Sequence, residues 1–177
     1  MSEPDLRYPI GRHEIEDALT SECRMTLIDQ IAALPGHARA AAAGLTSEQL
    51  ATPYRPGGWS VLQVLHHLPD SHLNGYIRFK LALTETVPTI KPYDEAAWAA
   101  LPDSGTTPLE VSLVLLDALH RRWVEVLLAM KPAEFARTLI HPERGRTFTL
   151  DQLLSLYAWH GRHHVAHVTA LRTRSGW

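Results

Sequence analysis

Apolar residues recur at helical spacing through four long segments of the chain. These segments are separated by short stretches rich in proline and glycine, at 53–58, 88–105 and 141–145. No segment keeps the strict apolar–polar alternation of a half-buried strand for more than a few residues. The pattern predicts an all-α protein in which four helices pack around one core.

The ends of the expected helices are marked by residues that favour helix starts and stops. Three of the four open with a serine or threonine followed three residues later by glutamine or glutamate, the signature of a capping box. Pro35 and Gly36 indicate a break or kink inside the first helix. Single helical turns are expected around Glu48 and over 95–99. The four long helices are expected over residues 19–43, 60–84, 107–130 and 149–172.

Histidines are concentrated in two windows, and the clearer window lies in the fourth expected helix. At about 100° per residue, His160 and His164 fall on the apolar stripe of that helix, one turn apart. Two imidazoles at this spacing can bind one metal ion. The alternative is that both are core histidines held by hydrogen bonds. His163 and His167 lie beside the stripe, where we expect them to be solvated or to support the ligands.

The second histidine window lies in the second expected helix. His67 shares a polar line with Gln63 and Asp70, which predicts either a solvated face or the wall of a wet cleft. His66 lies nearer the apolar face. Pro69 removes one helical hydrogen bond and should kink the helix, which blurs the phase of the pattern. Periodicity alone therefore leaves His66 and His67 both open as candidate ligands.

Charge and composition exclude several classes of partner. The formal net charge of −2 argues against a general nucleic-acid or anionic-membrane partner, since both are bound mainly through clustered lysine and arginine. No apolar run approaches the roughly 20 residues that cross a bilayer. The charged N-terminal region lacks the apolar core of a signal peptide, and a single cysteine cannot form an internal disulfide. We expect a single domain over residues 1–177 in the cytoplasm.

Several longer motifs resemble one known family. The chain resembles the YfiT-like metal-dependent hydrolases of the DinB superfamily of helical bundles, from its N-terminal region to its last residues. The motifs that carry the likeness are TPYRPGGW at 52–59, HHLPDSH at 66–72, YIRFKLALT at 76–84, PTIKPYDE at 88–95, HRRW at 120–123 and YAWHGRHHVAH at 157–167.

The resemblance implies a metal site and a topology. The implied ligands are His67, the second histidine of the HH pair, with His160 and His164. The implied fold is an up-down-down-up four-helix bundle that forms a homodimer and carries zinc or nickel. The family pattern has a small helix-forming residue where this chain has Pro69, which bears on the local geometry of the helix more than on the ligand.

Three functions are compatible with such a site. Three neutral imidazoles leave the ion its charge and an open position, which can hold water, as in a hydrolase, or a thiolate, as in a transferase of a low-molecular-weight thiol of the bacillithiol type. Both would act on a small-molecule substrate. The third possibility is a bundle that binds metal or ligand without turnover. Asp70, one turn after His67, is the candidate for orienting a ligand or transferring a proton.

Overall fold

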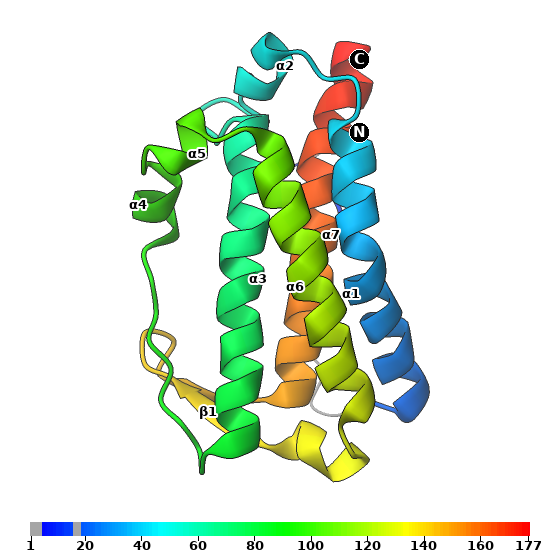
Figure 1. Ribbon diagram of the computed structural model, residues 1–177, viewed down its shortest axis with the longest axis vertical. Helices are drawn as coiled ribbons and strands as arrows, with labels where there is room; N and C mark the ends of the chain where they lie inside the picture. The colour runs from blue at the N-terminus through cyan, green and yellow to red at the C-terminus, as the bar shows by residue number, and fades with distance from the viewer. Residues whose placement is uncertain (1–4, 16–18) are drawn as a thin grey trace.

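The computed structural model describes residues 5–15 and 19–177. Four long helices stand side by side in this part of the chain and form the body of the molecule (Figure 1). The elements in chain order are α1 (Ser21–Ala42), α2 (Ser47–Ala51), α3 (Val61–Thr84), α4 (Glu95–Ala99), α5 (Asp103–Thr106), α6 (Leu109–Ala129), the 3-10 helix η1 (Pro132–Ala136), β1 (Thr138–His141), β2 (Arg146–Thr149) and α7 (Leu150–Ser175). Shorter helices and a hairpin lie near the ends of the bundle and, in the case of α4, beside α3.

The bundle has the up-down-down-up topology that the resemblance implied. Helices α1 and α7 run upward in Figure 1, and α3 and α6 run downward. Helix α1 packs against α6 and α7, and α3 packs against the same two helices from the other side. Helices α3 and α7 are therefore antiparallel neighbours. No helix in the described part of the chain combines the length and the apolar character that crossing a membrane requires.

Two of the expected capping boxes begin α3, which carries His67, and α7, which carries His160 and His164. At the start of α3, Ser60 Oγ accepts from the Gln63 backbone N–H at 3.1 Å, and Gln63 Oε1 accepts from the Ser60 N–H at 3.0 Å. Thr149 and Gln152 make the same reciprocal pair before α7. The third expected cap is wrong, because Thr107 ends α5 and α6 begins at Leu109 without a side-chain cap.

Both internal prolines lie inside unbroken helices, so of the break or kink expected near Pro35 the break is wrong, and the kink stays a prediction. Helix α1 continues through Pro35, and α3 continues through Pro69. The Ile31 carbonyl, which a proline at position 35 leaves without its usual helical partner, accepts a hydrogen bond from His120 Nδ1 at 2.6 Å. A tertiary hydrogen bond thus compensates for the one that the proline removes.

A short antiparallel hairpin, β1 and β2, was not expected from the sequence. Leu139 pairs with Phe148 in the hairpin, and both side chains are buried. Each strand has four residues and contributes a single buried apolar side chain, which is too little for an alternating pattern to be recognised. The hairpin leads directly into the Thr149 cap and so fixes where α7 starts.

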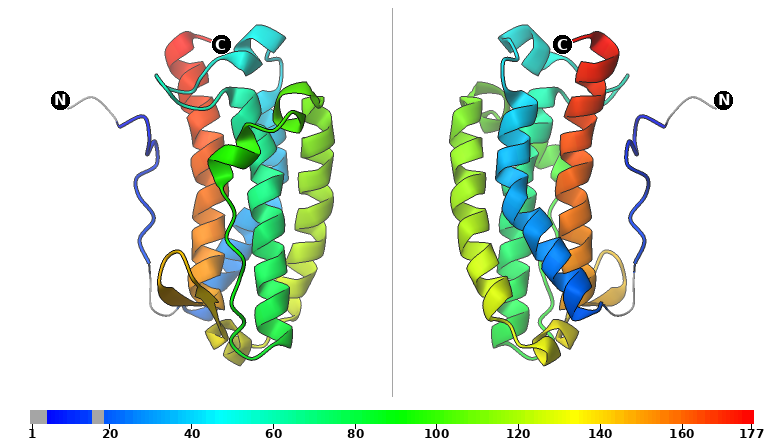
Figure 2. Two further views of the ribbon diagram at one scale, coloured as in Figure 1. Left: turned by 90° about the vertical axis from the view of Figure 1, so that its left-hand side faces the viewer. Right: turned by 90° about the vertical axis from the view of Figure 1, so that its right-hand side faces the viewer.

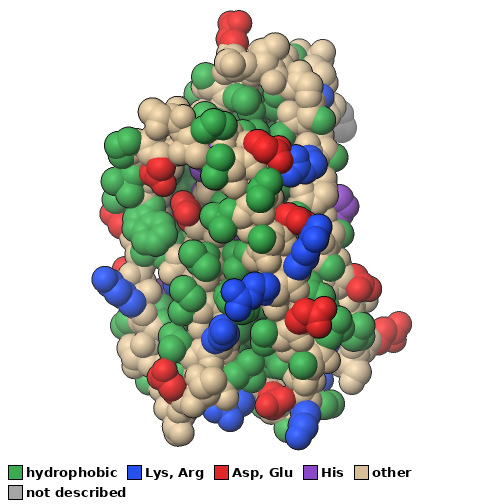
Figure 3. All heavy atoms as spheres, viewed as in Figure 1, with side chains coloured by type: hydrophobic (Ala, Val, Ile, Leu, Met, Phe, Trp, Pro, Cys, Tyr) green, Lys and Arg blue, Asp and Glu red, His purple; other side chains and the backbone are tan. Residues whose placement is uncertain are grey.

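The apolar core consists of two clusters separated by a layer of histidines. One cluster contains Ile31, Phe79, Trp123 and Leu154, and the other contains Leu34, Leu65, Leu116 and Val168. On α3 and α7, the residues between the two clusters include His72 and His160 respectively, and on α6 His120 follows Leu119 at the edge of the first cluster. The face formed by α3 and α6 mixes apolar and charged side chains and shows little histidine, although the chain holds 11 (Figure 3). Six of the histidines are buried: His66, His67, His72, His120, His163 and His167.

Candidate metal centre

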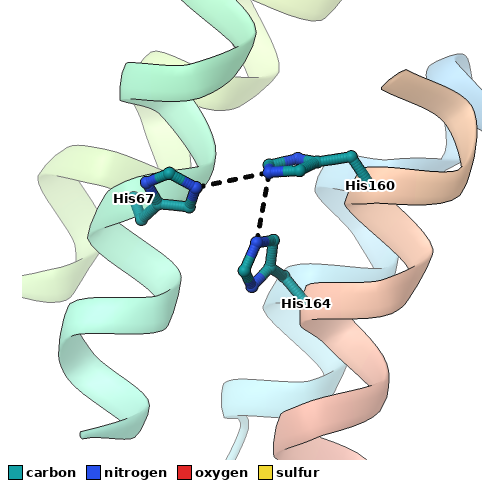
Figure 4. Close-up of side chains that lie close together, drawn as sticks. All are labelled: His67, His160 and His164. Atoms are coloured by element: carbon teal, nitrogen blue, oxygen red, sulfur yellow. Dashed lines mark hydrogen bonds between the residues drawn. The ribbon is translucent and has the colours of Figure 1, made fainter. Parts of the chain in front are cut away.

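Three histidine side chains from two helices converge on one point (Figure 4). His67 comes from α3, and His160 and His164 come from successive turns of α7. The Nε2 atom of His160 lies 3.3 Å from that of His67 and 3.1 Å from that of His164. These are the three residues that the resemblance implied, and their ligand atoms all lie within 4.8 Å of one another.

The donor set fits one divalent ion. Ligand nitrogens about 2.05 Å from a tetrahedral zinc lie about 3.3 Å from one another, close to the two separations around His160. Three imidazole nitrogens suit zinc, nickel or copper better than magnesium or calcium, which prefer oxygen ligands. These two separations therefore match those expected in a three-histidine zinc centre.

Burial keeps the three rings neutral, as metal ligation requires. Burial lowers the pKa of His67 to about 4. Burial also lowers the pKa of His160 and His164 well below the ordinary value, and the neighbouring histidines add to the shift. Each ring therefore has an unprotonated nitrogen near neutral pH. His67 itself is only 4% exposed, so the polar line that it shares on α3 is not solvated at this position.

A cavity of about 350 Å³ opens beside His164. Its wall includes the loop before α3, in which Gly57 adopts a left-handed conformation with φ of 66° and the Tyr54 N–H donates to the Trp59 carbonyl. The edge contact between the Trp59 and His67 rings, 4.9 Å between centroids, joins this loop to the metal centre. The lining residues are Arg7, Tyr8, Tyr54, Arg55, Gly57, Gly58, Trp59, His163, His164 and His167.

The N-terminal segment, residues 5–15, runs alongside α7 and completes this cavity (Figure 2). His167 Nε2 donates to the Arg7 carbonyl at 3.2 Å, and the Tyr8 ring lies 5.8 Å from that of His163. Sequence reasoning did not find this contribution, because residues 5–15 form no regular element whose face could be predicted. The contribution of the loop at 53–59 was easier to predict, since this loop belongs to a motif that carries the family likeness.

His163 and His167 do not line a solvated face. Both are buried, His163 stacked on Trp159 at 4.4 Å and His167 stacked on Tyr54 at 4.0 Å between ring centroids. Burial lowers the pKa of His163 to about 4. Among the described residues neither belongs to the three-histidine cluster, so the part of the expectation that they support the ligands stays a prediction.

Asp70 lies on α3, half-buried, one turn after His67. Burial and the nearby charge of Asp103 raise the pKa of its carboxyl. The backbone carbonyl of Asp70 accepts a hydrogen bond from Asn74 Nδ2 at 2.9 Å. Its role in proton transfer or ligand orientation stays a prediction.

A four-helix bundle that brings three histidines together at one point defines the class of this protein, and comparison with known proteins places it further. The chain matches the DinB superfamily over residues 30–168 and belongs to that superfamily. It is 54% identical over 173 residues to a protein of Bacillus mycoides (strain KBAB4) and to one of Bacillus cereus (strain B4264). Both relatives bear the name "Putative metal-dependent hydrolase", and each match covers 98% of this chain and 99% of the relative.

A solved structure has the same fold over almost its whole length. YfiT from Bacillus subtilis, described as a probable metal-dependent hydrolase with an unusual four-helix bundle topology, superposes with a TM-score of 0.95. The sequences are 46% identical, and the match covers 97% of this chain and 98% of YfiT. The family resemblance and the fold class expected from the sequence are both confirmed.

Proposed function

We propose that this protein is a metal-dependent hydrolase whose single divalent ion is held by His67, His160 and His164. The observation that carries the proposal is the convergence of three Nε2 atoms around one point at the edge of a cavity. The names of its relatives support the same activity. Because the donors are all imidazoles, we propose zinc or nickel as the ion.

The ion, when bound, supplies Lewis-acid chemistry by polarising an oxygen or sulfur group. The protein itself binds the substrate and excludes water from it. Aromatic rings of Tyr8, Tyr54 and Trp59 give the cavity apolar walls, which suit a small-molecule substrate. His164 belongs both to the cavity wall and to the ligand set, so a molecule bound there lies next to the centre.

Asp70 is the proposed proton carrier. A carboxyl whose pKa is raised by burial holds a proton more readily near neutral pH, which suits a general acid or base. The Asp70→Asn variant should keep its metal and lose activity. Unchanged activity in that variant would remove Asp70 from the mechanism and leave the metal site intact.

A second candidate function, transfer of a low-molecular-weight thiol of the bacillithiol type, is favoured by the charge of the cavity. Its described lining contains Arg7 and Arg55 but no aspartate or glutamate. Arg7 is paired with Asp5, whereas Arg55 donates to two neutral groups among the described residues, the Tyr54 hydroxyl and the Pro56 carbonyl. A cationic wall without a carboxylate favours an anionic nucleophile such as a thiolate.

One comparison separates the candidates. The metal-loaded protein is incubated with ester, amide and electrophilic substrates, each with and without added thiol. Turnover without thiol supports the hydrolase, and turnover of an electrophile only with thiol supports the transferase. No metal-dependent turnover in either arm would contradict both and favour a bundle that only binds.

A further inference from the structure

Two buried histidines outside the three-histidine centre form a chain that leads to it. His72 on α3 is 0% exposed, and His120 on α6 is 1% exposed. His72 Nε2 lies 3.3 Å from His160 Nδ1, and His72 Nδ1 lies 3.0 Å from His120 Nε2. The ring nitrogen of His160 that faces away from the centre is therefore joined to two further imidazoles in series.

The hydrogen bond at the His120 end of this chain of imidazoles determines which nitrogens donate and which accept. His120 Nδ1 lies 2.6 Å from the Ile31 carbonyl oxygen. A carbonyl oxygen can only accept a hydrogen bond, so His120 Nδ1 must carry the hydrogen. The carbonyl is available because Pro35, four residues on in α1, has no N–H to donate to it.

If each ring is neutral, the direction of the hydrogen bond at one of its nitrogens determines the direction of the hydrogen bond at the other. The rings of His72 and His120 are almost completely buried and no described carboxylate is hydrogen-bonded to either, so the uncharged form of each is favoured. A neutral imidazole has one donor and one acceptor nitrogen. His120 Nε2 then accepts from His72 Nδ1, and His72 Nε2 accepts from His160 Nδ1. His160 is left with its lone pair on Nε2, directed at His67 and His164.

We propose that His72 and His120 are positioning residues that hold His160 in the one tautomer able to bind the metal. The inference rests on the proposed metal site. A hydrogen bond from the remote ring nitrogen fixes the orientation of a ligating histidine and raises its basicity, and loss of such a partner typically costs about 10- to 100-fold in metal affinity. Here the partner is a chain of two imidazoles ending on a backbone carbonyl, where a carboxylate or a single carbonyl is the usual partner.

The first test needs no variant. Ring nitrogen NMR of the metal-free, ¹⁵N-labelled wild-type protein near neutral pH identifies which nitrogen of each histidine is protonated. His120, His72 and His160 should all carry hydrogen on Nδ1. Hydrogen on Nε2 of His160 would overturn the inference, whatever the metal affinity.

The second test compares two substitutions of buried histidines on α3. His72→Phe should lower zinc affinity, measured by chelator competition, by about 10- to 100-fold, and His160 should lose its single tautomer. His66→Phe is the matched control, because His66 is also buried but its Nδ1 bonds to Ser112 Oγ at 2.6 Å instead of to a ligand. Its zinc affinity should stay within a few-fold of wild type.

The outcomes also distinguish a failure of this inference from a failure of the proposed metal site on which it rests. Unchanged affinity in His72→Phe, or an equal fall in His66→Phe, would overturn the role of the chain. Wild-type protein that binds no zinc or nickel would overturn the proposed centre itself. If His72→Phe does not fold, the tautomer measurement on the wild-type protein decides alone.

Discussion

Gly75 on α3 lies directly against the ring of Tyr157 on α7. A β-carbon at Gly75 would lie 2.6 Å from Tyr157 Cζ and 2.7 Å from Cη2 of Trp123. These ring atoms belong to the buried core and cannot move aside as the end of a flexible chain would. The missing side chain therefore lets α3 and α7 approach closely, two turns from His67.

We expect Gly75→Ala to destabilise the protein and weaken metal binding. Overpacking of this kind costs about 1–3 kcal/mol. That cost should exceed the gain of about 1 kcal/mol from replacing a helical glycine. Denaturant unfolding of the metal-free variant and chelator competition of the folded variant measure the two effects.

Gly36→Ala is the matched control for that substitution. Gly36 also lies inside a long helix, but a β-carbon there would meet nothing within 4 Å. This variant should be as stable as wild type or more stable, by up to about 1 kcal/mol. Equal effects of the two substitutions would show that the contact with Tyr157 does not limit the packing of α3 on α7.

The metal-free protein should lose stability on mild acidification. Burial holds the pKa of His67 and His120 at about 4 in the folded chain, below the ordinary value of 6.5. Between these values the unfolded chain takes up protons that the folded chain does not. The free energy of unfolding should therefore be highest above about pH 6.5 and fall as the pH approaches 4.

Urea unfolding of the metal-free protein at several pH values measures this dependence. His120→Leu removes one of the titrating rings and should give a shallower fall below about pH 6.5. A free energy of unfolding that stays level from about pH 7 to 4.5 would show that the buried histidines take up protons without unfolding.

Removing the metal should abolish activity and leave the bundle folded. The two apolar clusters and the capping boxes of α3 and α7 do not depend on the ion. A structural zinc, by contrast, supplies on the order of 10 kcal/mol of folding energy in small domains. After chelation, circular dichroism should retain its helical signal, with cooperative unfolding at a somewhat lower temperature. Loss of helicity on chelation would make the ion structural.

The helices of this fold could be predicted because their signals are local. Reciprocal caps at Ser60 and Thr149 mark two starts, and His160 and His164 of α7 reach the same cluster, as their spacing of one turn indicated. The pairing of that stripe with His67 required the family resemblance. Periodicity left His66 and His67 open because both are buried, His66 against α6 through Ser112 and His67 toward α7.

The remaining features depend on contacts between segments far apart in the chain. The Ile31 carbonyl that Pro35 leaves without a helical partner is satisfied by His120, 89 positions further along the chain, and no local rule contains that partner. The cavity beside His164 depends on residues 5–15 lying along α7, with Arg7 bonded to His167 across 160 positions. A sequence pattern predicts which face of a helix is apolar. It does not predict which distant residue forms a hydrogen bond with a polar group on that helix.

The most direct test of the metal centre is the metal content of protein purified without nickel resin, determined by elemental analysis. Wild-type protein should contain about one zinc or nickel ion per chain, and His164→Ala should contain almost none. His163→Ala is the control, because His163 is the adjacent residue, is also buried, and lies outside the ligand cluster; it should retain the ion. Full metal content in His164→Ala, or loss of the ion in His163→Ala alone, would contradict the assignment of His67, His160 and His164.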